Sequence, residues 1–171
     1  MGLLHDRGDQ APKRRFQMRE RMLSIGDDYW IEDESGERAY LVDGKAMRLR
    51  ETWVLKDRDG KDVAEIKERK LSVRDKMHID LEGREATVTK RVIGLRDHFK
   101  VEVDGGADLK VHGNIVDHEY EIDRGGDKVA EISKKWFRLR DTYGVEIAPG
   151  EDPVLILAVT VAVDGMTHDL T

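Results

Sequence analysis

Residues 60–75 read GKDVAEIKERKLSVRD, and residues 126–141 read GDKVAEISKKWFRLRD. The two stretches are identical at seven of sixteen positions (Gly, Val, Ala, Glu, Ile, Arg and Asp) at an offset of 66 residues. Each begins at a glycine turn, continues as an alternating apolar strand and ends in an Arg-Asp pair. An internal repeat of this kind indicates an iterated supersecondary unit. The two stretches therefore predict a fold built from copies of one β-hairpin.

The repeat runs through most of the chain with a period of about 23 residues, which we call the beat. Large side chains recur with spacings of 23, 24, 22, 21 and 23 residues, at Trp30, Trp53, Met77, Phe99, Tyr120 and Tyr143. A unit of this length holds two strands and two turns. Six such units predict about twelve strands.

Local patterns support this count of strands. Apolar residues alternate at period two between residues 16 and 147, which is the signal of half-buried strands. Glycine turns separate the runs, because glycine supplies the positive φ that tight turns need; they fall at residues 34–36, 43–44, 58–60, 82–83, 104–106 and 124–126. Consecutive hairpins form an open meander or a closed barrel. Closure removes exposed sheet edges, so we predict a mainly β, closed antiparallel barrel.

The alternation stops at residues 148–153, APGEDP. Asp152 is a good helix N-cap and Pro153 a good first helical residue. Residues 154–163, VLILAVTVAV, are apolar on every side. Their β-branched content favours a buried strand, whereas the cap and the proline favour a helix. A helix threaded through a twelve-stranded barrel would be surrounded by protein and would fill a lumen too wide for the wall's own side chains.

The chain of 171 residues has the length of one domain. Residues 1–15 show no periodicity and are predicted to be a flexible lead that ends in a basic cluster, Lys13-Arg14-Arg15. Residues 16–166 form the predicted barrel domain, and residues 167–171 a C-terminal tail.

Composition limits the possible functions. Charged residues make up 39% of the chain, but 36 acids and 30 bases are interspersed and give a net charge of −6. This pattern indicates a solvated surface and not the one-sided basic footprint of a nucleic-acid-binding protein. The chain has no cysteine, which excludes thiol catalysis and fits a reducing cytoplasm. Its longest apolar run spans ten residues, against about 20 for a membrane-spanning helix. No signal peptide is visible. We therefore expect a soluble, cytoplasmic protein.

Three longer phrases carry a family resemblance: IGDDYWIEDESG (residues 25–36), GNIVDHEYEI (residues 113–122) and FRLRDTYGVEIAPGEDPVLILAVTVAVD (residues 137–164). With the repeated VAEI strands, they resemble the LURP-one-related family over about residues 16–166. That family is similar in fold to the tubby C-terminal domain and to phospholipid scramblases. The resemblance implies a twelve-stranded barrel around a buried hydrophobic helix at residues 153–163. Because tubby-like relatives bind phosphoinositides and scramblase-like relatives contact lipid, it also implies lipid contact, but no single binding residue can be matched.

Basic residues cluster where one hairpin passes to the next. In an up-and-down barrel these connections share one end, while the Asp/Gly turns share the other, so we expect one basic rim and one acidic rim. A basic rim could dock on an anionic bilayer, at ~1 kcal/mol per basic residue near the surface. The alternative is an ordinary solvated rim whose positive charge is offset by Glu65, Glu68 and Glu131. The candidate ligand-binding residues are Lys67, Arg69, Lys70, Lys90, Arg91, Lys134, Lys135 and Arg138. They form three clusters, which begin at Lys67, Lys90 and Lys134 and are expected at the same position in three units. No aromatic platform accompanies them, which argues against nucleic acid.

Acids and histidines offer weaker candidates. The beat residues follow a repeated acid at Glu51, Asp75, Asp97 and Asp141. These acids either form a ring that binds a cation or catalyses proton transfer, or they cap a bend in each unit; regular recurrence favours the bend.

His112 and His118 flank residues 113–117 and could hold a metal with Asp117 or Glu119, but their spacing matches no metal motif. Residues 57–60 resemble the start of a calcium loop but lack its third ligand, and are expected to be a hairpin turn. No hydrolase, phosphate-loop or zinc-protease motif is present. We therefore expect no catalytic residue, metal or cofactor.

The leading prediction is a non-enzymatic module that binds anionic lipid or a membrane surface through the basic rim. Two alternatives remain open at this point. One is a protein-interaction or scaffold domain, and the other is a scramblase-like lipid-handling protein.

Overall fold

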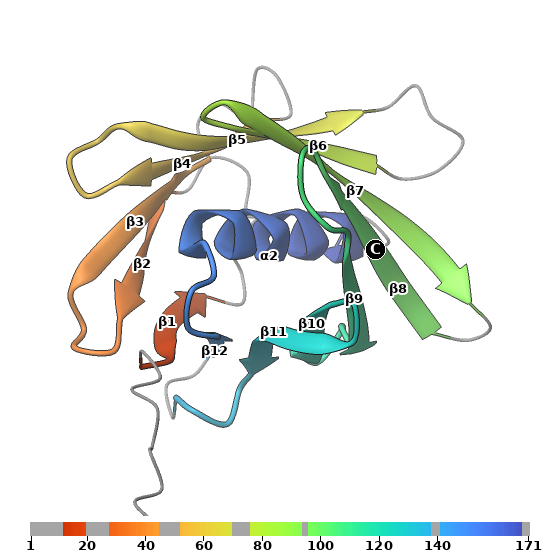
Figure 1. Ribbon diagram of the computed structural model, residues 1–171. Coiled ribbons are helices and arrows are strands. Elements are labelled where there is room, and N and C mark those ends of the chain that lie inside the picture. Colours follow the sequence, from red (N-terminus) through yellow and green to blue (C-terminus); the bar gives the residue numbers. More distant parts are fainter. Residues whose placement is uncertain are drawn as a thin grey trace, which may run out of the picture.

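The protein is a closed barrel of antiparallel strands with a helix running through its centre (Figure 1). The computed structural model describes residues 12–19, 28–44, 52–69, 76–93, 96–137 and 141–168. Each strand pairs with its neighbours in the sequence, and β1 pairs with β12 to close the barrel. The predicted fold class is confirmed. The strands are β1 (Arg14–Arg19), β2 (Tyr29–Asp33), β3 (Arg38–Asp43), β4 (Thr52–Asp57), β5 (Asp62–Arg69), β6 (Lys76–Leu81), β7 (Arg84–Ile93), β8 (Arg96–Val103), β9 (Leu109–Asn114), β10 (Glu119–Arg124), β11 (Asp127–Ser133) and β12 (Thr142–Ile147).

The beat of large residues corresponds to one inward-facing side chain near the start of each even-numbered strand. Five of the six predicted positions are buried: Trp53, Met77, Phe99, Tyr120 and Tyr143. The first unit differs, because Tyr29 is the buried residue there and Trp30 lies on the outer face, 5.1 Å below the Arg38 guanidinium. Neighbouring residues of a strand point to opposite faces, so this shift by one residue turns Trp30 outward.

The central helix α2 (Pro153–His168) begins where the cap predicted. The Asp152 side chain accepts a hydrogen bond from the backbone N–H of Val154 at 3.0 Å. The helix packs against β5, β6, β7 and β12, and residues 155–166 are buried. It ends at His168 and not at residue 163, so its last turn includes the first residues of the expected tail. Within the described part of the chain, no helix is long and apolar enough to span a membrane.

Gly165 explains how the helix continues past its apolar run. A Cβ atom at this position would lie 2.8 Å from Cε of Met77 and 3.1 Å from Cη2 of Trp53. The missing side chain therefore lets two beat residues, from β6 and β4, press against the last turn of α2. A glycine that suggests a helix end in the sequence is a packing position in the structure.

Two turns at the end where α2 begins are held by the same kind of hydrogen bonds, from backbone N–H groups to an aspartate side chain. Asp33 Oδ1 accepts hydrogen bonds from the backbone N–H groups of Ser35 and Glu37, at 2.9 and 3.0 Å. Asp57 Oδ1 does the same for Asp59 and Lys61, at 2.9 and 3.0 Å. The glycine in each turn has φ of 81° or 84°, which side chains other than glycine rarely adopt. The predicted turns at residues 34–36 and 58–60 are confirmed, and residues 57–60 form a hairpin.

The basic cluster at the start of the chain belongs to the barrel wall. β1 starts at Arg14, inside the expected lead, and pairs with β12. Lys13 and Arg15 hold Glu146 of β12, at 3.2 and 2.6 Å. Partial burial raises the pKa of Glu146, but the hydrogen bonds from these two cations outweigh it and leave the pKa below its ordinary value. Residues 1–11 of the predicted lead lie outside the described residues.

Candidate functional site: a basic rim above a buried polar cluster

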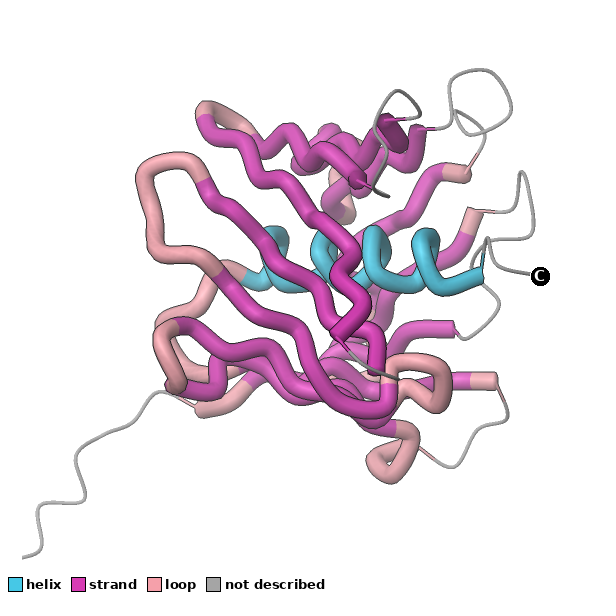
Figure 2. The backbone as a smooth tube through the Cα atoms, turned by 90° about the vertical axis from the view of Figure 1, so that its right-hand side faces the viewer, coloured by secondary structure: helices cyan, strands magenta, loops and turns pink. Residues whose placement is uncertain are grey.

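The hairpin order brings the predicted basic clusters to one end of the barrel. Strands β5, β7 and β11 end, and β6, β8 and β12 begin, at the end where α2 finishes, which is the side marked by the C-terminus in Figure 2. We call this end the basic rim and define it by Lys67, Arg69, Lys90, Arg91, Lys134 and Lys135. Lys70 and Arg138, also predicted, lie outside the described residues, as does the side chain of Arg69.

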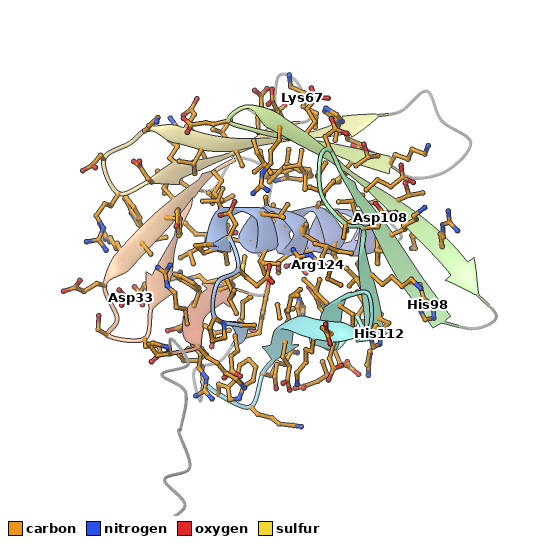
Figure 3. The ribbon with its side chains drawn as sticks, in the orientation of Figure 1. Asp33, Lys67, His98, Asp108, His112 and Arg124 are labelled. Atoms are coloured by element: carbon orange, nitrogen blue, oxygen red, sulfur yellow. The ribbon has the colours of Figure 1, made fainter. Side chains whose placement is uncertain are left out.

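The pairing register shows which residues of the three clusters are equivalent. Buried alanines mark the same position in β5, β7 and β11: Ala64, Ala86 and Ala130. Lys67 is the third residue after its alanine, whereas Lys90 and Lys134 are each the fourth. Lys90 stands opposite the buried Phe99 and so takes an inward-facing position. Lys67 is exposed and points away from the barrel (Figure 3).

The structurally equivalent cations are the fifth residues after these alanines, namely Arg69, Arg91 and Lys135. Arg91 is opposite His98 on the outer face of β7, and Lys135 is exposed in the turn that follows β11. Neither Arg91 nor Lys135 forms an ion pair with a side chain that the structure describes, whereas Lys67 lies 2.9 Å from Glu65. Because that exposed pair contributes at most ~1 kcal/mol, the Lys67 ammonium is only weakly held.

A short hydrogen-bond network fixes the rim at the end of β11. Glu119 Oε1 accepts hydrogen bonds from Ser133 Oγ and from the backbone N–H of Lys134, both at 3.0 Å. The backbone N–H of Lys135 in turn donates to Ser133 Oγ at 3.1 Å. These contacts hold the Lys134–Lys135 backbone against β10, so the exposed cation projects from a fixed corner.

The opposite end of the barrel carries mostly acids in its described turns and adjoining strand residues. Its exposed acids are Glu34, Glu37, Asp59, Asp62, Glu82, Glu85, Asp104, Asp108 and Asp127, and its exposed bases over the same turns and strand ends are Arg38, Arg58, Lys61, Arg84, Lys110 and Lys128. Lys13 and Arg15 also lie towards this end, since they flank the first residue of β1, which pairs with the end of β12. The basic start of the chain therefore does not join the basic rim.

A buried acid lies beneath the basic rim. Asp164, in the last turns of α2, is 2% exposed. It accepts a hydrogen bond from the Tyr143 hydroxyl, and its Oδ1 lies 3.4 Å from Nε2 of His118. The His118 and Tyr143 rings stack with centroids 4.3 Å apart. Tyr143 and His118 thus give polar partners to a carboxyl group that burial removes from water.

Two further tyrosines surround the acid. Burial raises the pKa of Tyr29, Tyr120 and Tyr143 well above the ordinary value, and the charge of Asp164 raises each of them further. All three hydroxyls therefore remain protonated near neutral pH. The Tyr29 hydroxyl is buried and has no hydrogen-bond partner among the described residues.

His118 reaches this cluster from an unusual backbone conformation. It ends the turn between β9 and β10 with φ of 54°, in the left-handed region. Its backbone N–H donates to the carbonyl oxygen of Ile115 at 3.2 Å, and the Asn114 side chain donates to Asp117 Oδ2 at 2.7 Å. For a residue other than glycine or asparagine this conformation costs about 1–2 kcal/mol. This strained backbone conformation directs the His118 imidazole into the barrel.

The repeated acids do not behave as one set. Glu51 and Asp75 lie outside the described residues. Asp141 is exposed and has φ of 60° immediately before β12, so the predicted bend is present there. At Asp97 the prediction of a bend is wrong, because β8 passes through this residue in unbroken register with β7.

The two histidines considered as a metal pair are on opposite faces of the wall. His118 is buried inside the barrel, whereas His112 lies on the outer side of β9 (Figure 3). His112 instead contacts Asp123 of β10. The sequence pattern also missed Asp164 and Tyr29; the only signal for Asp164 was an acid directly after ten nearly continuous apolar residues.

Comparison with known proteins agrees with this architecture. A twelve-stranded barrel closed around a C-terminal helix is a tubby-like barrel. Within that class, the chain belongs to the LURP-one-related family, which it matches over residues 14–164. The family predicted from the sequence is confirmed.

Two similar proteins extend the comparison. The chain is 25% identical over 153 residues to the uncharacterized protein YxjI of Bacillus subtilis (strain 168), covering 89% of this chain and 93% of that protein. The fold of the present chain is similar to the X-ray structure of a protein from Arabidopsis thaliana, with a TM-score of 0.60, 18% identity and 91% of each chain covered. The likeness to the plant protein concerns the fold alone.

Proposed function

We propose that this protein is a non-enzymatic, cytoplasmic binding module that docks on anionic lipid surfaces through its basic rim. The observation that carries the proposal is the exposed pair Arg91 and Lys135, which project from equivalent hairpins and form no ion pair with a described side chain. Lys67 projects from the same end and is held only by a surface pair with Glu65. The three cations are exposed at the same end of the barrel, so each can meet phosphate groups of a surface that approaches this end.

The charge distribution supports an oriented approach. The net charge is −6, so an anionic surface repels the protein as a whole. The acidic turns at the far end strengthen that repulsion. The rim cations oppose it locally, although the exposed acids Asp28, Asp117 and Asp141 at the same end offset part of their charge. Fields of this kind orient a protein during its approach. We therefore expect the barrel axis to stand upright on the membrane with the C-terminal end of α2 towards the lipid.

The expected affinity is low. Each cation near an anionic leaflet contributes ~1 kcal/mol. Lys67, Arg91 and Lys135 together give ~3 kcal/mol, which corresponds to a dissociation constant of about 6 mM in available lipid. Binding of this strength is reversible. It weakens as salt shortens the Debye length from about 30 Å at 0.01 M to about 8 Å at 0.15 M.

Vesicle flotation tests the proposal. The full chain is mixed with vesicles of phosphatidylcholine alone or with added phosphatidylserine, at millimolar lipid and across a salt series. The proposal expects flotation only with the anionic vesicles, decreasing as the salt concentration rises. Equal flotation with both vesicles, or none with anionic vesicles at low salt, would contradict it, and the absence of binding would favour a protein partner.

A further inference from the structure

The outer wall carries a cluster of metal-ligating side chains that the lipid-binding proposal does not use. His112 of β9 stands directly opposite Glu121 of β10 in the antiparallel ladder. Asp123 is two residues further along β10 and so lies on the same outer face. One ligand atom from each of these three side chains lies within 4.8 Å of the other two. We propose that His112, Glu121 and Asp123 bind a divalent transition-metal ion of the zinc class.

The donor set suits such an ion. One imidazole nitrogen with two carboxylate oxygens is a borderline set that zinc accepts, with a solvent molecule in the fourth position. A tetrahedral zinc ion with bonds of about 2.0–2.2 Å holds its ligand atoms about 3.4 Å apart. The three ligand atoms already lie within 4.8 Å of one another. Small changes of side-chain rotamer therefore suffice to reach this spacing.

The surroundings make the site rigid and accessible. All three residues stand on β9 and β10, whose backbones pair over six successive residues. The side chains of His112 and Asp123 are 39% and 20% exposed, so an ion can enter from solvent and retain a water molecule. Since the wall fixes the Cα positions, binding requires little ordering of the backbone.

Two lysines oppose a bound cation. Lys128 Nζ lies 3.7 Å from Glu121 Oε1 and 2.9 Å from Glu131 Oε2, and Lys110 stands opposite Asp123 in the ladder. Lys128 can remain paired with Glu131 when Glu121 turns to the metal, but its charge still weakens binding. The arrangement therefore predicts a change in each direction: loss of His112 weakens metal binding, and loss of Lys128 strengthens it.

The test is zinc titration of the full chain by calorimetry in metal-free buffer. The wild type is expected to bind one equivalent. His112→Ala should lower the affinity about tenfold or more, since it removes the nitrogen ligand, and Lys128→Gln should raise it. The matched control is His78→Ala, because His78 also faces an acid, Glu85, at 3.4 Å, but belongs to no three-residue cluster among the described side chains.

Cobalt(II) absorbance supplies a second readout, because a bound tetrahedral ion gives an intense visible band. The proposal expects this band in the wild type and in His78→Ala but not in His112→Ala. Melting curves without metal check that all variants fold. Absence of saturable zinc binding, or equal affinity in the wild type and His112→Ala, would overturn the proposal. An equal loss in His78→Ala would also overturn it, because it would indicate non-specific binding to surface histidines.

Discussion

The Tyr143 hydroxyl donates a hydrogen bond to Asp164 inside the barrel and so connects β12 to the last turns of α2. Asp164 is a buried carboxylate in an otherwise apolar helix, and His118 approaches it from the β9–β10 turn. One acid therefore joins three segments that are distant in sequence. Because all three lie at the end that carries the basic rim, the cluster fixes the scaffold on which the rim cations stand.

Replacing the tyrosines around Asp164 by phenylalanine should separate their roles. Tyr143→Phe removes a hydrogen bond to a charged group and should lower the free energy of unfolding by about 1.5–3 kcal/mol. Tyr29→Phe removes a buried hydroxyl that has no hydrogen-bond partner among the described residues, so it should be neutral or slightly stabilising. Urea unfolding of both variants measures the difference. Equal effects would mean that the Tyr143–Asp164 bond contributes nothing specific.

High pH should destabilise the protein. Burial holds the pKa of Tyr29, Tyr120 and Tyr143 well above the ordinary tyrosine value of 10.0, while the unfolded chain ionises near that value. Above pH 10 the folded state therefore binds more protons than the unfolded state, and stability falls as pH rises; below pH 10 these groups cause no change. Tyrosinate absorbance followed together with circular dichroism measures this dependence. Ionisation of all four tyrosines with the fold intact would contradict the burial of the cluster.

Gly165→Ala should destabilise the barrel even though alanine favours helices. The new methyl group would meet Cε of Met77 at 2.8 Å, which that flexible side chain can relieve by moving, and the rigid ring of Trp53 at 3.1 Å, which it cannot, so the overpacking costs about 1–3 kcal/mol and arises mainly at Trp53. The helix propensity of alanine returns about 1 kcal/mol of this. Gly106→Ala is the control, because its Cβ would make only ordinary contacts with Val103. Thermal melting that ranks Gly165→Ala at or above the wild type would disprove the close approach.

Ile156→Asp should unfold the protein. Ile156 is fully buried in the first turn of α2, inside the barrel, and an unpaired charge there has no partner to offset its desolvation. Val116→Asp tests the same substitution at an exposed position, where the side chain is 68% accessible, and should leave the melting temperature nearly unchanged. A cooperatively folding Ile156→Asp variant would show that the helix does not occupy the core.

The sequence predicted the barrel because each of its six repeat units independently predicts one hairpin. An error in one unit therefore does not change the predicted number of strands. The sequence did not predict which aromatic residue of the first unit faces the core, since Tyr29 and Trp30 are adjacent and equally suited to burial. Only pairing with β3 decides which of the two faces inward.

The site was harder to predict for the same physical reason. A shift of one residue moves a side chain to the other face of a strand, so Lys67 and Lys90 look equivalent in sequence but face opposite sides of the wall. The partners of Asp164 come from β12 and from the β9–β10 turn, and no local pattern connects them. His112, Glu121 and Asp123 likewise come together only through the register of β9 and β10.

The most direct test of the basic rim compares two double variants in flotation with anionic vesicles at low salt. Arg91→Gln/Lys135→Gln removes two cations from the rim, and Arg58→Gln/Lys61→Gln removes two exposed cations from the opposite end, so both variants carry the same net charge. The account predicts that the rim variant loses ~2 kcal/mol of binding, about 30-fold, while the control binds like the wild type. Equal binding by the two variants would contradict the proposed role of the rim.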